Sequence, residues 1–102
     1  MSAVVVLVTA PPDRAESLAR SLVEARLAAC VATTSIRSVY RWNGAVEEAA
    51  EVQLVIKTTE DRVEAIGAHL RAHHPHEVPE MLALPVVAGS AAYLEWVTSE
   101  TR

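Results

Sequence analysis

Residues 3–8, Ala3-Val4-Val5-Val6-Leu7-Val8, form an unbroken run of apolar and mostly β-branched side chains. Such a run, apolar at both odd and even positions, is typical of a central strand that is buried on both faces of its sheet. The run is too short to cross a membrane, and it lacks the basic start of a signal peptide. Residues 3–8 therefore predict the centre of a sheet in a cytoplasmic protein that has no membrane partner.

Three helices are expected along the rest of the chain, two of them from apolar side chains that recur at helical spacing. The first follows the Pro-Pro pair at 11–12 and ends near Leu27, and the second covers 61–73. A short last helix covers 90–97, with Ser90 as its N-cap. The inward-facing positions are Ala15, Leu18, Ala19, Leu22 and Val23 in the first helix, and Val63, Ile66, Gly67 and Leu70 in the second.

Extended segments lie between these helices. Residues 30–56 contain Asn43-Gly44, a strong hairpin signal, because both central residues of a type I′ turn need positive φ. Residues 81–84, bounded by prolines, predict one more buried strand. The order is then β-α-β-β-α-β plus a terminal helix, which predicts an α+β, ferredoxin-like fold with a four-stranded antiparallel sheet. The length allows one such domain, over residues 1–102.

The predicted fold places both main helices on one face of the sheet. A first strand that is apolar on both sides needs cover on both, so the bare face is expected to pack against further copies of the chain. The alternative is that the last helix folds under the sheet, although so short a helix covers little of it. The sequence thus favours an oligomer.

A two-residue loop at Asn43-Gly44 pairs the hairpin residues symmetrically and places Cys30 opposite Lys57, provided that no β-bulge interrupts the pairing. One face is expected to pack under the helices, with Val31, Val39, Val46, Val52, Leu54 and Ile56. The other face mixes small, apolar and ionisable groups, as in a subunit interface with a cleft. It carries Cys30, Ala32, Thr34, Ile36, Ser38, Tyr40, Glu47, Ala49, Glu51, Gln53, Val55 and Lys57.

The composition narrows the functions. A formal charge of −4 and a pI near 5.5 argue against a nucleic-acid partner, which would need clustered Lys and Arg. Cys30 is the single cysteine, so neither an intramolecular disulfide nor a structural zinc site needed for folding is expected. No phosphate-binding loop, nucleophile elbow or zinc-protease motif occurs, and no catalytic dyad stands out. The chain is therefore not expected to be an enzyme.

Several side chains could bind a metal ion. An ammonium beside a thiol favours the metal-binding thiolate, although Cys30 can equally be a small buried side chain. The four histidines fall between His69 and His76, and the i, i+4 spacing of His69 and His73 can place two imidazoles on one side of a helix. Histidines at a helix C-terminus can also merely complement its dipole. On a helical wheel His74 faces the core and His69 the solvent.

Five stretches of the sequence together resemble one protein family over nearly the whole chain. They are Leu27-Ala28-Ala29-Cys30, Tyr40-Arg41-Trp42-Asn43-Gly44, residues 51–59, His73-His74-Pro75-His76-Glu77-Val78-Pro79-Glu80, and the ending with Leu84-Pro85-Val86, Gly89 and Tyr93-Leu94-Glu95-Trp96. The chain is similar to the CutA family, the divalent-cation tolerance proteins. This resemblance implies a ferredoxin-like subunit in a compact homotrimer.

The resemblance also implies a metal-responsive function in which copper, as Cu(II), or another divalent cation binds at Cys30, His73 and His74. His76 replaces the usual tyrosine and adds a candidate ligand, whereas Val8 stands where some members have a further cysteine. The implied inter-subunit cleft is lined by Tyr40, Trp42, Lys57, Glu77 and Glu80. A small-molecule sensor that binds its ligand in that cleft is the alternative, by analogy with other trimeric proteins, and a scaffold for protein partners is a third.

Overall fold

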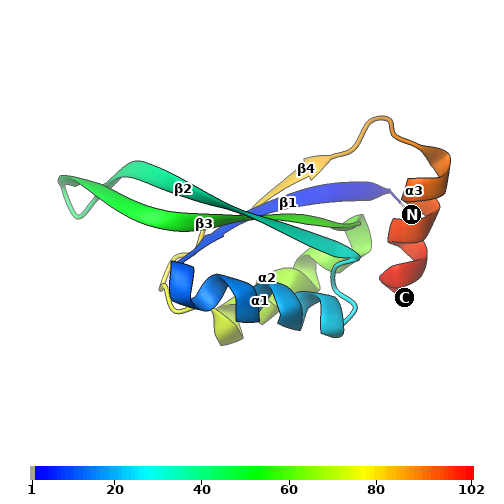
Figure 1. The fold of residues 1–102 in the computed structure, drawn as a ribbon, viewed down its shortest axis with the longest axis horizontal. Helices are drawn as coiled ribbons and strands as arrows, with labels where there is room; N and C mark the ends of the chain where they lie inside the picture. Colours follow the sequence, from blue (N-terminus) through cyan, green and yellow to red (C-terminus); the bar gives the residue numbers. More distant parts are fainter. Residues whose placement is uncertain (1) are drawn as a thin grey trace.

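The computed structural model describes residues 2–102 and follows the predicted order of elements. The strands form one antiparallel sheet in the ferredoxin-like order β2-β3-β1-β4, and α1 and α2 cover one of its faces (Figure 1). No helix within residues 2–102 is both long and apolar enough to cross a membrane. The elements are β1 (Ala3–Ala10), α1 (Pro12–Glu24), β2 (Cys30–Trp42), β3 (Ala45–Thr59), the 3₁₀ helix η1 (Glu60–Arg62), α2 (Val63–His73), β4 (Leu82–Pro85) and α3 (Ala91–Glu100).

The hydrophobic core lies between the sheet and the two long helices. β1 contributes alternate side chains to it, since Val4, Val6 and Val8 are buried whereas Val5 and Leu7, on the opposite face, are only partly buried. The largest fully buried apolar side chains are Leu22, Leu54, Ile56, Ile66, Leu70, Val6, Val8 and Val97. Most predicted inner positions of the two helices lie in the core, but Val23 is 41% exposed, so its predicted inward position is wrong.

The β2–β3 hairpin has the predicted register along its full length, from Trp42 opposite Ala45 to Cys30 opposite Lys57, with no bulge. Asn43 and Gly44 adopt φ values of 49° and 79°, as a tight hairpin turn requires. One part of the prediction is wrong. Val39 and Val46 are 67% and 63% exposed and do not pack under the helices, because the far half of the hairpin extends beyond them (Figure 1).

Two element predictions also need correction. The first helix ends at Glu24 and not near Leu27, because Arg26 adopts a left-handed φ of 58° while the Leu27 amide donates to the Leu22 carbonyl. The last strand is not buried within the subunit. β4 pairs only with β1, at the edge of the sheet, and its Leu82 and Leu84 side chains are 55% and 46% exposed.

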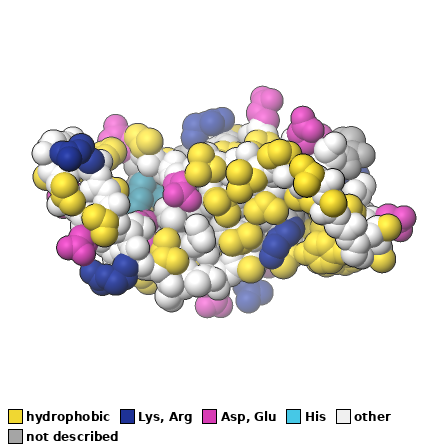
Figure 2. Space-filling model, turned by 90° about the horizontal axis from the view of Figure 1, so that it is seen from above, with side chains coloured by type: hydrophobic (Ala, Val, Ile, Leu, Met, Phe, Trp, Pro, Cys, Tyr) yellow, Lys and Arg dark blue, Asp and Glu magenta, His cyan; other side chains and the backbone are white. Residues whose placement is uncertain are grey.

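The sheet face that α1 and α2 leave uncovered carries an apolar surface, which we call the open face. Seen from above, hydrophobic side chains gather over this side of the sheet (Figure 2). α3 lies beyond the end of the sheet (Figure 1). The alternative prediction, that the last helix folds under the sheet and covers its bare face, is therefore wrong. The strand register assigns to the open face the apolar residues Val5, Leu7, Ile36, Val55, Leu82 and Leu84.

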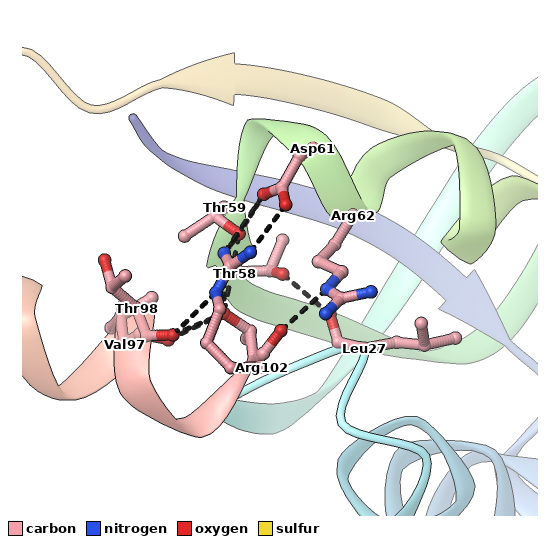
Figure 3. Close-up of polar contacts among 9 residues, drawn as sticks. Leu27, Thr58, Thr59, Asp61, Arg62, Val97, Thr98 and Arg102 are labelled. Carbon is pink, nitrogen blue, oxygen red and sulfur yellow. Dashed lines mark hydrogen bonds and ion pairs between the residues drawn. The ribbon is translucent and has the colours of Figure 1, made fainter. Parts of the chain in front are cut away.

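A polar network holds α3 in this position (Figure 3). The Arg102 guanidinium donates to both carboxylate oxygens of Asp61, at 2.6 and 3.1 Å, and to the Thr59 hydroxyl at 2.7 Å. Arg62 Nε donates to the Thr101 carbonyl at 2.6 Å. The hydrogen bonds from Arg102 and from the Thr59 hydroxyl hold the pKa of Asp61 far below its usual range. The C-terminal helix is therefore tied to the end of β3 and to η1.

Candidate functional site

A pocket of about 740 Å³ lies between the β2–β3 hairpin and the segment 75–80 that follows α2. Its lining includes most of the cleft residues expected from the sequence, together with one of the four histidines. Ser38, Tyr40 and Glu51 share the open-face side of their strands, so the pocket borders the open face. The polar and aromatic lining residues are Thr9, Ser38, Tyr40, Trp42, Glu51, His76, Glu77 and Glu80.

His74 fixes the segment that closes one side of this pocket. Its Nδ1 accepts a hydrogen bond from the His76 backbone amide at 3.0 Å, which requires that the ring proton lie on Nε2. Nε2 then donates to the buried Thr9 carbonyl at 2.7 Å. The wheel prediction that His74 faces the core is confirmed. Both ring nitrogens are in use, so a metal ion at His74 would have to break one of these bonds.

Cys30 and Lys57 face each other as the hairpin register predicts, with the Lys57 Nζ atom 3.9 Å from the Cys30 Sγ atom. They lie away from the pocket. Lys57 pairs with Val5, whereas the pocket meets β1 at Thr9, about 13 Å further along the strand at 3.3 Å per residue. Within one subunit, Lys57 therefore does not share a cleft with Glu77 and Glu80.

The histidines fall into two groups. The His74 and His76 rings lie 5.0 Å apart between centroids, at the pocket, and the His69 and His73 rings lie 4.3 Å apart on α2. The prediction that His69 is solvated is wrong, since the ring is partly buried and its Nε2 atom is 2.8 Å from the Ser21 hydroxyl of α1. Burial, and to a lesser extent the charge of His73, lowers the pKa of His69.

The four residues expected to bind metal thus occupy three places in the subunit: Cys30 beside Lys57, His73 on α2, and His74 with His76 at the pocket. Within residues 2–102, no three His, Cys, Asp or Glu side chains converge as a metal site would require. Sequence reasoning missed Thr9, whose carbonyl anchors His74. Because the acceptor is a backbone atom, no residue type in the sequence signals this contact.

Comparison with known proteins assigns the chain to a family. Residues 4–100 match the model of the CutA1 divalent ion tolerance protein family. The chain belongs to the CutA family. The CutA relative from Pectobacterium atrosepticum, named divalent-cation tolerance protein CutA, is 46% identical over 98% of this chain and 93% of its own length. The family resemblance seen in the sequence is confirmed.

Solved CutA structures have the same subunit fold. CutA1 from Oryza sativa superposes with a TM-score of 0.96 at 42% identity, over 100% of this chain and 95% of that chain. The PII-like protein CutA from Nostoc sp. PCC 7120, in apo form, superposes with a TM-score of 0.93 at 34% identity, over 97% of each chain. The α+β fold with a four-stranded antiparallel sheet is therefore the CutA fold.

Proposed function

We propose that the chain contributes to divalent-cation tolerance as a homotrimer that binds a divalent metal ion, Cu(II) in the first instance, at the pocket beside the open face. The observation that carries this proposal is that the His76 imidazole and the carboxylates of Glu51, Glu77 and Glu80 line one pocket, although within one subunit they do not converge on a single point. Imidazole favours ions such as copper and zinc, and carboxylate oxygens can complete the coordination of zinc. The relative from Pectobacterium atrosepticum is named for divalent-cation tolerance.

The open face supports the trimer in this proposal. Leucines on the edge strand β4 and partly buried Val5 and Leu7 on the central strand leave apolar area that a further copy of the chain can cover. Because Ser38, Tyr40 and Glu51 belong both to this side of the sheet and to the pocket, a neighbouring subunit packed there also borders the pocket. Cys30 of that neighbour, which lies on the open-face side of β2, can then complete the coordination. The proposed role is binding, not catalysis.

Calorimetric titration with Cu(II) and Zn(II) tests the metal proposal. The variant His76→Asn/Glu80→Gln removes two donors from the pocket, and we expect its Cu(II) affinity there to fall at least tenfold. Glu48→Gln is the matched control, since Glu48 lies on the same hairpin but outside the pocket, 3.7 Å from Arg37 in an exposed ion pair. Equal Cu(II) affinity at the pocket in all three proteins would reject the proposal.

A small organic ligand is the second candidate, favoured by the aromatic side of the same pocket. Tyr40 and Trp42 line it, and its volume of about 740 Å³ falls in the range of small-molecule sites. The Nostoc relative is described as PII-like. A metabolite screen by thermal shift distinguishes the two candidates, because a pocket ligand adds RT ln(1 + [L]/Kd) to the free energy of unfolding and so raises the melting temperature. A hit whose shift disappears in Trp42→Ala, with no effect of Cu(II), would favour the organic ligand.

A further inference from the structure

A second pair of imidazoles lies outside the pocket, on the helical side of the subunit. His69 and His73 are one turn apart on α2, and their ring centroids are separated by 4.3 Å with 42° between the ring planes. His73 is exposed, whereas His69 is partly buried against Ser21 of α1. α1 and α2 cover the sheet face opposite the open face, so the pair stays accessible when the open face is covered (Figure 1).

The hydrogen bonds of Ser21 fix the tautomer of His69. A serine hydroxyl has one proton, and the Ser21 hydroxyl donates it to the Leu18 carbonyl at 2.8 Å. Towards His69 the Ser21 oxygen can then only accept, so the ring proton of His69 lies on Nε2, 2.8 Å from that oxygen. The Nδ1 atom of His69 is left with its lone pair. A ring whose second nitrogen donates to a fixed acceptor is the usual arrangement of a histidine that ligates a metal.

The spacing of the two rings fits a single metal ion. A metal about 2.0–2.1 Å from one nitrogen of each ring, at a bond angle between about 90° and 110°, places the ring centroids about 4.5–5 Å apart. The observed 4.3 Å lies just below this range, and the His73 side chain is exposed and free to change its rotamer. The Arg14 guanidinium, which donates to the His73 carbonyl at 3.3 Å, opposes a cation here.

We infer that His69 and His73 form a second, solvent-accessible site for one divalent transition-metal ion per subunit, with Ser21 orienting His69 and water completing the coordination. Two imidazoles select Cu(II), Ni(II) or Zn(II) over Mg(II) and Ca(II), which prefer oxygen ligands. The site is independent of the proposed pocket function, because none of its residues lines the pocket or the open face. It needs no neighbouring subunit.

The test uses the full-length chain with the pocket donors removed, His76→Asn/Glu80→Gln, so that failure of the pocket proposal and failure of this one are separable. Titration of this variant with CuCl₂, followed by calorimetry and electron paramagnetic resonance, is expected to show one Cu(II) per subunit with two nitrogen ligands. Adding His73→Gln, an exposed change with little effect on folding, is expected to reduce the affinity at least tenfold. Adding Ser21→Ala instead is expected to weaken binding 10- to 100-fold.

Two results would overturn the inference. One is that the His76→Asn/Glu80→Gln variant binds no Cu(II) although its unfolding curve matches that of the native chain. The other is bound Cu(II) whose affinity and nitrogen signal do not change on adding His73→Gln. Glu16→Gln, on the exposed surface of α1, is the matched control and is expected to leave the affinity within about twofold.

Discussion

Replacing His74 by alanine tests whether this residue holds the structure together or ligates a metal. The imidazole makes two hydrogen bonds, from Nε2 to the Thr9 carbonyl at 2.7 Å and from the His76 amide to Nδ1 at 3.0 Å. Each is worth about 0.5–1.5 kcal/mol net in the folded protein. His74→Ala removes both, and it also removes a buried ring that fills space between the end of α2 and β1.

The larger part of the cost comes from Thr9. Thr9 is buried, so its carbonyl loses its partner at a place where water enters poorly, a penalty of about 1–3 kcal/mol. The His76 amide belongs to an exposed residue and can bond to water. We therefore expect His74→Ala to lower the free energy of unfolding by about 2–4 kcal/mol. His74→Gln can keep a donor near the Thr9 carbonyl, so its expected loss is about half as large.

Urea unfolding followed by tryptophan fluorescence measures this difference. All variants are compared at one protein concentration and with a chelator present, because assembly and bound metal each shift apparent stability. His76→Ala is the control from the same segment, and its stability is expected to stay within about 0.5 kcal/mol of the native chain. If His74→Ala unfolds with the native midpoint but no longer binds Cu(II), His74 is a ligand and the structural role argued here is refuted.

Three further predictions follow from the fold. Leu84→Lys places a charge on the open face, and sedimentation velocity is expected to show a shift towards smaller species, since burying the exposed half of Leu84 is worth about 1 kcal/mol per subunit. Asp61→Asn is expected to lower the melting temperature at pH 7. Because the pKa of Asp61 is lowered in the folded state, this difference is full above about pH 4 and shrinks as the pH falls further. Gly44→Ala is expected to cost about 1 kcal/mol in urea unfolding, since φ at Gly44 is 79°.

The strand pairing could be predicted from the sequence because one local signal determines it. Asn43-Gly44 defines a two-residue loop, and antiparallel pairing without a bulge extends that register to Cys30 and Lys57. How far the helices cover the hairpin could not be predicted in the same way. The alternation of side chains placed Val39 and Val46 on the helical side correctly, but the length of α1 and its angle to the hairpin decide where that cover ends. Neither quantity is present in a strand pattern.

The histidine region shows a second limit of the sequence. The helical wheel was extended through His74, whereas His74 precedes Pro75, which disfavours helical backbone at that residue. Its φ and ψ values of −81° and 136° end α2 and turn the ring inward, which separates His73 from His76. The wheel also shows one helix at a time. It could not show that Ser21, on α1, accepts a hydrogen bond from His69.

The two proposed sites should respond differently to assembly, and this follows from where each lies on the subunit. Tyr40 and Glu51 line the pocket and also lie on the open-face side of the hairpin, so two subunits packed there can share one ligand. Such a ligand must stabilise the association of the subunits. Association must in turn strengthen ligand binding by the same free energy. The pair His69 and His73 lies on the helical side and has no such linkage. A charge at Leu84 that separates the subunits should therefore weaken metal binding at the pocket and leave binding at the helical pair unchanged. In the proposed assembly, association through the open face thus affects binding at the pocket and not at the helical pair.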